Sequence, residues 1–381
     1  MRRSTLTLVT LLLVVAAPLA GATTVGAASA QADSCTFPYS ATDATGTEVT
    51  VDSDPERVVT LSPSAAQTMW ELGASDEVVG VSQYAAYLDG ADEKANVSGG
   101  GGPSVERVLA ANPDLVLVPN STYGFARDRV EQIRAQGVPV FVFGAGTSLS
   151  FVADKTEQIG RLTGNCEAGR ESAAEIRTSV DQMREVLADE EKPVGLNYFY
   201  GYTSGANTFI GDVMTTGGLR NGAAEANITG FAQVNTETVV EMNPEYVVVP
   251  SGASVPSTAA WNSTTAVQEG NVVAVNENYL QQPAPRSVDA AETIMQAVHP
   301  EAFEEYRAMQ TQSNATATAA ETEMATTTGD APETTAQATT TVAVDDTPAA
   351  SQTATGTSTP GFGVLLAFVS LLATALLATR R

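Results

Sequence analysis

Short valine-rich runs recur along the middle of this chain, and segments that favour helix separate them. Four runs lie at residues 57–62, 78–82, 115–119 and 139–143, and three more lie at 194–200, 246–250 and 272–275. Strands that are apolar throughout, with helices between them, indicate parallel sheets that are covered on both faces. The expected fold class is therefore α/β, with one parallel sheet built from each set of runs.

A helix-favouring segment separates the two sets. Residues 167–190 are rich in Ala, Glu and Arg and contain neither Gly nor Pro after Gly169. This composition predicts one long helix. We place the boundary between two lobes in that helix, which gives an N-terminal lobe at 31–165, a linking helix at 166–192 and a C-terminal lobe at 193–310. A chain of 381 residues is long enough for two domains with tails.

One segment of the first lobe recurs in the second. Residues 104–119 align without a gap on residues 235–250, and the identities include a Glu, an Asn-Pro pair and alternate valines. In each copy Ser104 or Asn235 is predicted to cap a short helix, the Asn-Pro pair to end it, and a buried strand to follow. The repeat indicates that the two lobes are related.

The repeated glutamates, Glu106 and Glu237, stand near the start of each predicted helix. A helix that leads into the N-terminal end of a parallel strand begins at the opposite edge of the sheet, where the ligand crevice of such folds lies. We therefore expect both carboxylates at the rim of the mouth. A second interpretation stays open, in which each Glu only complements the positive end of a helix dipole.

Residues 55–300 resemble the family of siderophore and vitamin B12 binding proteins of ABC importers. The resemblance rests on residues 56–63 and 80–84, on both copies of the repeat, and on Ala284-Pro285-Arg286. It implies a monomer with two lobes, a rigid joining helix and a ligand cleft between the lobes. Its implied partners are a membrane permease and the attached ATPase. In this family one Glu per lobe docks onto permease arginines, which implies that role for the repeated glutamates.

The ligand candidates also come from the resemblance. The closest local matches are to the branch of the family that binds vitamin B12, and they imply these contact residues: Tyr84, Tyr87, Tyr202, Phe231 and Arg286. Aromatic rings offer broad apolar contact with a polar tip, which suits a corrinoid. Residues 98–102 depart from that branch, because glycines stand where it has a tryptophan. An Fe(III)-siderophore or haem therefore stays open as the ligand.

A purely structural role remains the alternative for each of these candidates. Each aromatic residue could serve core or surface packing, with Tyr198 pointing into the sheet, and Arg286 could pair with a surface acid. Trp70 and Trp261 are predicted to be packing residues. The glycines at 98–102 either let the backbone approach a ligand or form a flexible loop.

The residue inventory disfavours metal and enzyme chemistry. His299 is the sole histidine, and no cluster of carboxylates and histidines is visible, so a bare zinc or manganese site is disfavoured. We predict no catalytic residue, no metal ligand, and no cofactor besides the transported corrinoid or ferric chelate. Metallocluster or chelatase chemistry would need clustered cysteines, histidines or paired buried carboxylates. A structural or adhesive surface protein is a third class, which a stalk and an anchor alone would allow.

The charge of the chain is strongly negative. It has 44 acidic residues, 19 basic residues and a formal charge of -25, and its lysines are Lys94, Lys155 and Lys192. An acidic surface poor in lysine is expected in very high salt, where screening removes the self-repulsion. We infer a halophilic source, with an ordinary acidic secreted protein as the alternative. Either way the charge argues against a nucleic-acid partner.

The N-terminal residues predict export. Residues 1–30 combine early arginines, an apolar run and small residues before residue 31, as in a secretory signal peptide. The arginine pair leaves the Tat route open beside the Sec route. Cys35 and Cys166 are the two cysteines, and in an exported chain such a pair favours a disulfide over a metal site. Two free thiols remain the alternative.

The C-terminal residues predict a stalk and an anchor. Residues 311–359 are rich in Thr, Ala, Glu, Gln and Pro, which predicts a disordered stalk. Residues 360–381 hold Pro-Gly-Phe, an apolar run and two arginines. This arrangement resembles the PGF-type sorting signal of archaeal surface proteins, which implies processing by an archaeosortase and a lipid anchor. We expect a cell-surface protein held at the outer face of the cytoplasmic membrane, with the C-terminal helix either retained or cleaved.

Overall fold

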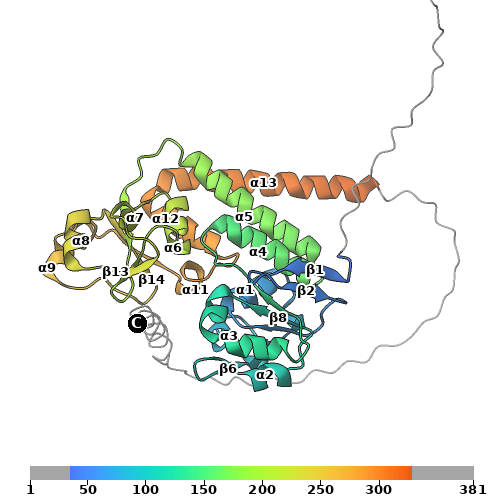
Figure 1. Cartoon of the computed structure of the whole chain (residues 1–381). Helices are drawn as coiled ribbons and strands as arrows, with labels where there is room; N and C mark the ends of the chain where they lie inside the picture. The colour runs from blue at the N-terminus through green and yellow to red at the C-terminus, as the bar shows by residue number, and fades with distance from the viewer. Residues whose placement is uncertain (1–34, 328–381) are drawn as a thin grey trace, which may run out of the picture. The chain divides into compact units, whose positions relative to one another are not determined.

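The chain forms two parallel sheets in a computed structural model that describes residues 35–327 (Figure 1). The N-terminal sheet has the order β5-β4-β3-β8-β9, formed by β3 (Val58–Thr60), β4 (Val78–Val81), β5 (Ala95–Asn96), β8 (Leu115–Val118) and β9 (Val140–Val142). All its neighbouring strands pair in parallel. Helices α1 (Pro63–Glu71) and α3 (Asn120–Arg134) follow two of its strands.

The C-terminal sheet is also parallel throughout. Its order is β12-β10-β14-β15, formed by β10 (Val194–Asn197), β12 (Arg220–Asn221), β14 (Tyr246–Pro250) and β15 (Val272–Val275). Each valine-rich run therefore forms a strand, and the predicted α/β class is confirmed. The run at 194–200 is a shorter strand than predicted, because Tyr200 (φ 47°) and Gly201 (φ 88°) form a tight turn just after it.

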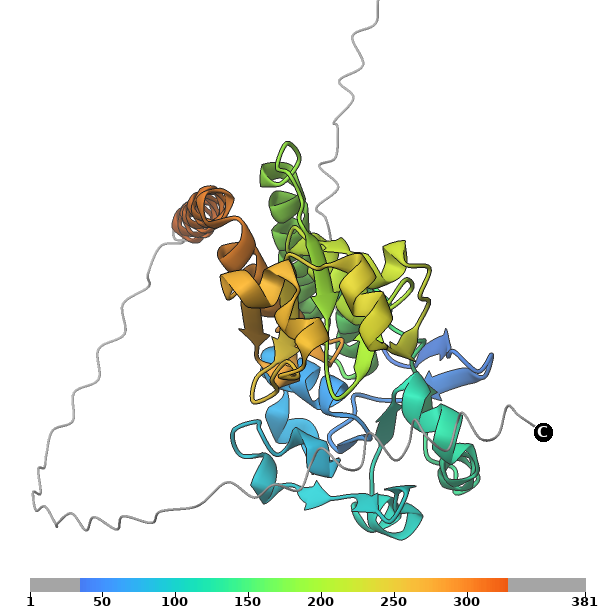
Figure 2. The same ribbon diagram turned by 90° about the vertical axis from the view of Figure 1, so that its left-hand side faces the viewer.

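Helix α5 (Cys166–Val186) lies between the two sheets in the sequence and packs against helices from both sides of it. It contacts α4 (Leu149–Leu162) at a close approach, where a Cβ on Gly160 would stand 2.8 Å from the Cα of Gly169. It also contacts α12 (Ser287–Val298) and α13 (Pro300–Thr327), as Figures 1 and 2 show. One apolar cluster includes Val152 of α4, Ile176 of α5 and Ile294 of α12. The helix is thus held by a shared core.

The end of α5 differs from the predicted range of 166–192. The helix stops at Val186, and Leu187 caps it with its side chain buried. Three acidic residues follow at 189–191, and they would lie at the negative end of the helix dipole. Pro193 then disfavours helical backbone at the residue before it.

The predicted stalk also differs at its start. Helix α13 continues to Thr327, so residues 311–327 are helical. Ala, Glu, Gln and Met favour helix, and extending an existing helix avoids the cost of nucleation. The rest of the stalk, the signal peptide at 1–30 and the sorting signal at 360–381 lie outside the described residues. No helix within 35–327 is both long and apolar enough to cross a membrane.

Cys35 and Cys166 form a disulfide, with their Cα atoms 5.7 Å apart. Cys166 is the first residue of α5, and Cys35 precedes an antiparallel hairpin of β1 (Tyr39–Thr42) and β2 (Glu48–Val51) that the sequence reading did not predict. The bond therefore ties the start of the described chain to the long helix.

Replacing both cysteines by alanine is expected to lower the free energy of unfolding by roughly 2–5 kcal/mol. The reason is that the bond closes a loop with a sequence separation of 131 residues, which restricts the unfolded chain. Urea unfolding of the variant and the wild type in the same high-salt buffer measures the difference. Equal unfolding midpoints would show that the bond does not restrict the unfolded chain.

Candidate functional site

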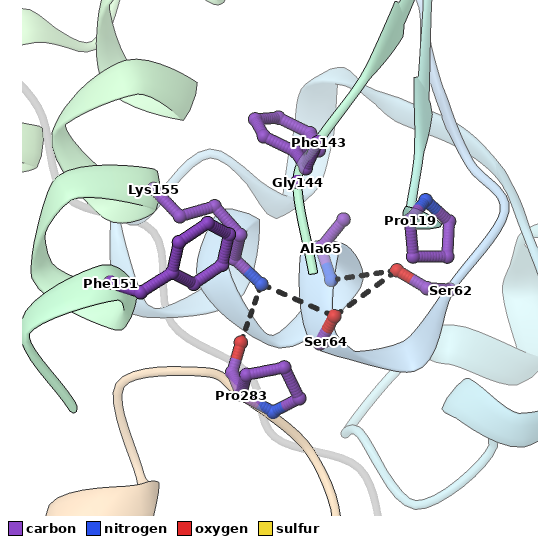
Figure 3. Close-up of a pocket in the computed structure, with 9 residues that line it drawn as sticks. All are labelled: Ser62, Ser64, Ala65, Pro119, Phe143, Gly144, Phe151, Lys155 and Pro283. Carbon is purple, nitrogen blue, oxygen red and sulfur yellow. Dashed lines mark hydrogen bonds between the residues drawn. The ribbon is translucent and has the colours of Figure 1, made fainter. Parts of the chain in front are cut away.

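A small cavity lies at the carboxyl edge of the N-terminal sheet (Figure 3). Pro119 directly follows β8, and Gly144 stands two residues after the end of β9. Both residues line the cavity, which has a volume of about 20 Å³. Ligands of open parallel sheets bind at this edge, because the loops that follow the strands converge there. The cavity therefore marks the edge where a ligand site is expected.

Lys155 of α4 is a buried lysine at this cavity that the sequence did not lead us to predict. Its side chain lines the cavity and is buried, with the residue 5% exposed. The ammonium donates hydrogen bonds to Ser64 Oγ at 3.2 Å and to the backbone oxygen of Pro283. Burial lowers the pKa of Lys155 to about 7. A sequence signal existed, because Lys155 stands between Val152 and Ile159 on the apolar face of its helix.

The burial of Lys155 predicts a specific pH dependence of stability. Its folded pKa lies below the unfolded value, so between pH 7 and 10.5 the unfolded chain binds a proton that the folded chain lacks. The free energy of unfolding should rise with pH in this window. Lys155→Met should be the more stable protein at pH 6, by at most on the order of 5 kcal/mol, and the difference should shrink towards pH 10.

Urea unfolding of both proteins at a series of pH values measures this difference. The buffer salt should have a bulky anion such as gluconate, so that no small anion can enter the cavity and compensate the charge of Lys155. A difference that stays constant from pH 6 to pH 10 would contradict the lowered pKa of Lys155.

The segment before α12 contacts the N-terminal half of the chain through two of the predicted ligand residues. Tyr87 Oη accepts a hydrogen bond from Gln67 Nε2 at 2.8 Å and donates one to Gln282 Oε1 at 3.0 Å. Arg286 Nε donates to Glu71 Oε1 at 2.6 Å, in an ion pair. Burial raises the pKa of Tyr87 to about 12, and the hydrogen bond from Gln67 opposes this shift.

Because of these contacts, the polar groups of Tyr87 and Arg286 already have partners within the protein. The polar tip of Tyr87 and the guanidinium of Arg286 are both engaged. The pairing of Arg286 with an acid, which the sequence left open, is the arrangement in this structure. Tyr84, the remaining candidate in the N-terminal half, lies half-buried in a helical turn at Gln83–Ala85 just after β4.

Tyr202 and Phe231 come together in a two-stranded ribbon that was not among the predicted strands. Strands β11 (Tyr202–Ser204) and β13 (Phe231–Gln233) pair antiparallel, with Ser204 opposite Phe231. The ring of Phe199 lies 6.2 Å from that of Tyr202 and stands perpendicular to that of Phe231 at 6.4 Å. Tyr202 is 8% exposed, whereas Phe231 is 48% and Tyr200 is 47% exposed. The ribbon therefore presents exposed aromatic surface just beyond the carboxyl end of β10.

The two repeated glutamates occupy the same position in matching helices. Glu106 is the second residue of α2 (Val105–Ala110), and Glu237 is the second residue of α8 (Thr236–Met242). Ser104 Oγ and Asn235 Oδ1 cap the two helices. Both glutamates are exposed, and within residues 35–327 neither forms an ion pair.

The Asn-Pro pairs explain how each copy of the repeat leaves its helix. Asn112 (φ 47°) and Asn243 (φ 42°) both adopt left-handed backbone, which Asn tolerates better than most residues. The chain then enters β8 or β14. Because these strands are parallel to their neighbours, α2 and α8 begin towards the carboxyl edges of their sheets.

Residues 98–102, which include four glycines, form a hairpin that a neighbouring arginine holds by hydrogen bonds. Strands β6 (Ser98–Gly99) and β7 (Gly102–Pro103) pair antiparallel, and Gly101 has φ 74°. Arg129 donates to the backbone oxygens of Gly100 at 3.0 Å and Pro103 at 3.1 Å. Arg129 therefore holds this loop.

Trp70, Tyr198 and Trp261 pack with apolar clusters, and His299 is buried. Trp261 is 3% exposed, and its ring lies 4.7 Å from that of Tyr198. Trp70 Nε1 donates to the backbone oxygen of Asp89 at 2.8 Å. His299 is buried and bonds to the backbone oxygen of Gly218 at 3.0 Å. Among residues 35–327, no three His, Cys, Asp or Glu side chains gather as a metal site would require.

Comparisons with known proteins identify the family to which this chain belongs. The chain matches the model of the periplasmic binding protein family over residues 58–279, and the PGF-CTERM motif over residues 359–381. It is 42% identical over 316 residues to a cobalamin-binding protein of Halobacterium salinarum, which covers 78% of this chain and 85% of that protein.

Solved structures share the fold. The periplasmic vitamin B12 binding protein BtuF of Vibrio cholerae aligns with a TM-score of 0.57 at 23% identity, over 66% of this chain and 98% of that one. The periplasmic heme-binding protein RhuT of Roseiflexus sp. RS-1 aligns with a TM-score of 0.57 at 24% identity, over 64% and 99% of the two chains.

Proposed function

We propose that this chain, which belongs to the periplasmic binding protein family, captures a corrinoid outside the cell and delivers it to a membrane permease. The class is that of extracytoplasmic substrate-binding subunits of ABC importers, which are not enzymes. The PGF-CTERM motif indicates anchoring at the cell surface through the C-terminus. What such proteins carry is a transported ligand rather than a cofactor.

The observation that carries the corrinoid proposal is the relationship to the cobalamin-binding protein of Halobacterium salinarum, at 42% identity over most of both chains. The aromatic ribbon supports it. The ring of Phe231 is exposed at a carboxyl edge, so water covers its apolar surface when no ligand is bound. A large, flat ligand with apolar faces gains from contact with such rings. The ring of Tyr202 is buried and lies beside that of Phe199, so it stabilises the ribbon.

The two glutamates complete the proposal. Glu106 and Glu237 are exposed, occupy matching helix positions and form no ion pair within the described residues, so both carboxylates are available to arginines of a permease. Two separated contact points fix an orientation, whereas one would allow rotation. The ATPase on the inner side and an archaeosortase acting at residues 360–381 are the other proposed partners.

A competition experiment tests the choice of ligand. The full-length protein is incubated in high salt with equal concentrations of cyanocobalamin, a ferric hydroxamate and haemin, and is then desalted on a column. The absorption spectrum of the protein fraction identifies what is retained. We expect corrin bands alone. Retention of haemin or of the ferric chelate in place of the corrinoid would contradict the proposal and favour the alternative ligand.

A further inference from the structure

We propose that the cavity beside Lys155 binds one small monovalent anionic group, for which a halide ion is the simplest candidate. This inference goes beyond corrinoid capture, because it rests on the buried lysine and its cavity and holds whichever compound is transported.

The first argument is that the ammonium form of Lys155 has no opposite charge beside it. Lys155 is 5% exposed, and among residues 35–327 no carboxylate forms an ion pair with it. A buried ammonium without an opposite charge is costly, and natural proteins rarely leave one unpaired. An anion in contact with this group would supply the missing charge.

The second argument concerns hydrogen-bond donors. A lysine ammonium has three N–H donors. Two of them bond to Ser64 Oγ and to the backbone oxygen of Pro283, as Figure 3 shows. The third has no acceptor among the described residues, and the side chain lines the cavity. An anion there would accept this remaining donor.

The third argument is that the first turn of α1 adds positive potential beside the lysine. Ser64 and Ala65 of this turn both line the cavity, and Ser62 Oγ caps the helix by accepting from Ala65 N at 3.2 Å. The turn contains no acidic residue that would repel an anion. The hydroxyls of Ser62 and Ser64 lie 3.2 Å apart and offer a further donor.

The size and the lining of the cavity restrict which anion can bind. A volume of about 20 Å³ holds one water-sized group, so a halide fits within the cavity, whereas a sulfate or phosphate ion would extend beyond it. Phe143, Phe151 and Pro119 line the remainder, and an apolar lining strengthens the attraction between opposite charges. The anion is therefore a free halide or a single oxygen of a carboxylate or phosphodiester on the transported compound.

The experiment for the free halide uses bromide. Crystals of the full protein grown in bromide are expected to show an anomalous scattering peak within hydrogen-bond distance of Lys155 Nζ, and crystals of Lys155→Met are expected to lack it. In solution, exchanging gluconate for bromide at constant ionic strength should raise the melting temperature of the wild type. Lys155→Met should lose this dependence. Lys192→Met, which removes a lysine outside the cavity, should retain it.

Binding of cyanocobalamin separates the two sources of the anion. If the halide is free, the dissociation constant should be the same in wild type and Lys155→Met. If an oxygen of the compound fills the cavity, bromide should compete with it, and Lys155→Met should bind at least tenfold more weakly. A missing bromide peak, together with equal bromide dependence and equal cyanocobalamin affinity in the two proteins, would overturn the proposal. Circular dichroism of Lys155→Met verifies that it is folded.

Discussion

A double variant with Glu106→Lys and Glu237→Lys is expected to support no corrinoid uptake, although it should bind cobalamin as tightly as the wild type. Both carboxylates are exposed and lie at the same position of α2 and α8, outside the aromatic ribbon that we assign to the ligand. Reversing their charge would replace two attractive contacts with permease arginines by two repulsive ones. High salt screens distant charges but leaves contacts at hydrogen-bond distance largely intact.

Uptake of radiolabelled cobalamin by cells that lack the chromosomal gene and carry each variant on a plasmid measures this effect. Single variants should lose most of the uptake, because one remaining contact does not fix the orientation. Asp128→Lys and Glu241→Lys provide the control, since these acids are also exposed on helices but lie beyond the first turn of α3 and α8. Normal uptake by the double variant would refute the docking role.

Phe231→Ala should weaken cobalamin binding about tenfold to a hundredfold, which corresponds to about 1.4–2.8 kcal/mol. The ring of Phe231 is 48% exposed without a ligand, although it stands beside Phe199 in the ribbon. A bound corrin would cover this surface, and truncation to Ala removes that contact without disturbing a buried core. Titration calorimetry of wild type and variant gives the two dissociation constants.

Val272→Ala is the matched control for Phe231→Ala. Val272 is 39% exposed, but it is the first residue of β15 and so lies at the amino edge of its parallel sheet, opposite the proposed ligand edge. Its loss should leave the affinity unchanged. A Phe231→Ala protein that binds like the Val272→Ala protein would remove the ribbon from the ligand site.

The sheets could be predicted from the sequence because their signal is local. Each run, such as 115–118 or 246–250, is apolar on both faces and is bounded by residues that end helices. The repeat added what a single run could not provide, namely the matching positions of Glu106 and Glu237. These inferences required no knowledge of which segments meet in space.

The details of the site depend on distant pairings that no local pattern encodes. Arg286 pairs with Glu71, which is 215 residues away. The ribbon pairs Tyr202 with Gln233, which is 31 residues away, and two helices and a strand lie between them in the sequence. The position of Lys155 on the apolar face of its helix could be seen in the sequence, but only the fold shows that Pro283 lies beside its ammonium. Composition and spacing could therefore indicate the class of protein, whereas the partners of individual side chains required the structure.

Titration calorimetry of the full-length protein with cobalamin in molar salt tests the central claim most directly. We predict saturable binding with one cobalamin per chain, and no binding of a ferric hydroxamate or of haemin under the same conditions. The absence of a binding signal for cobalamin and for other corrinoids, with a protein that is folded by circular dichroism, would contradict the account.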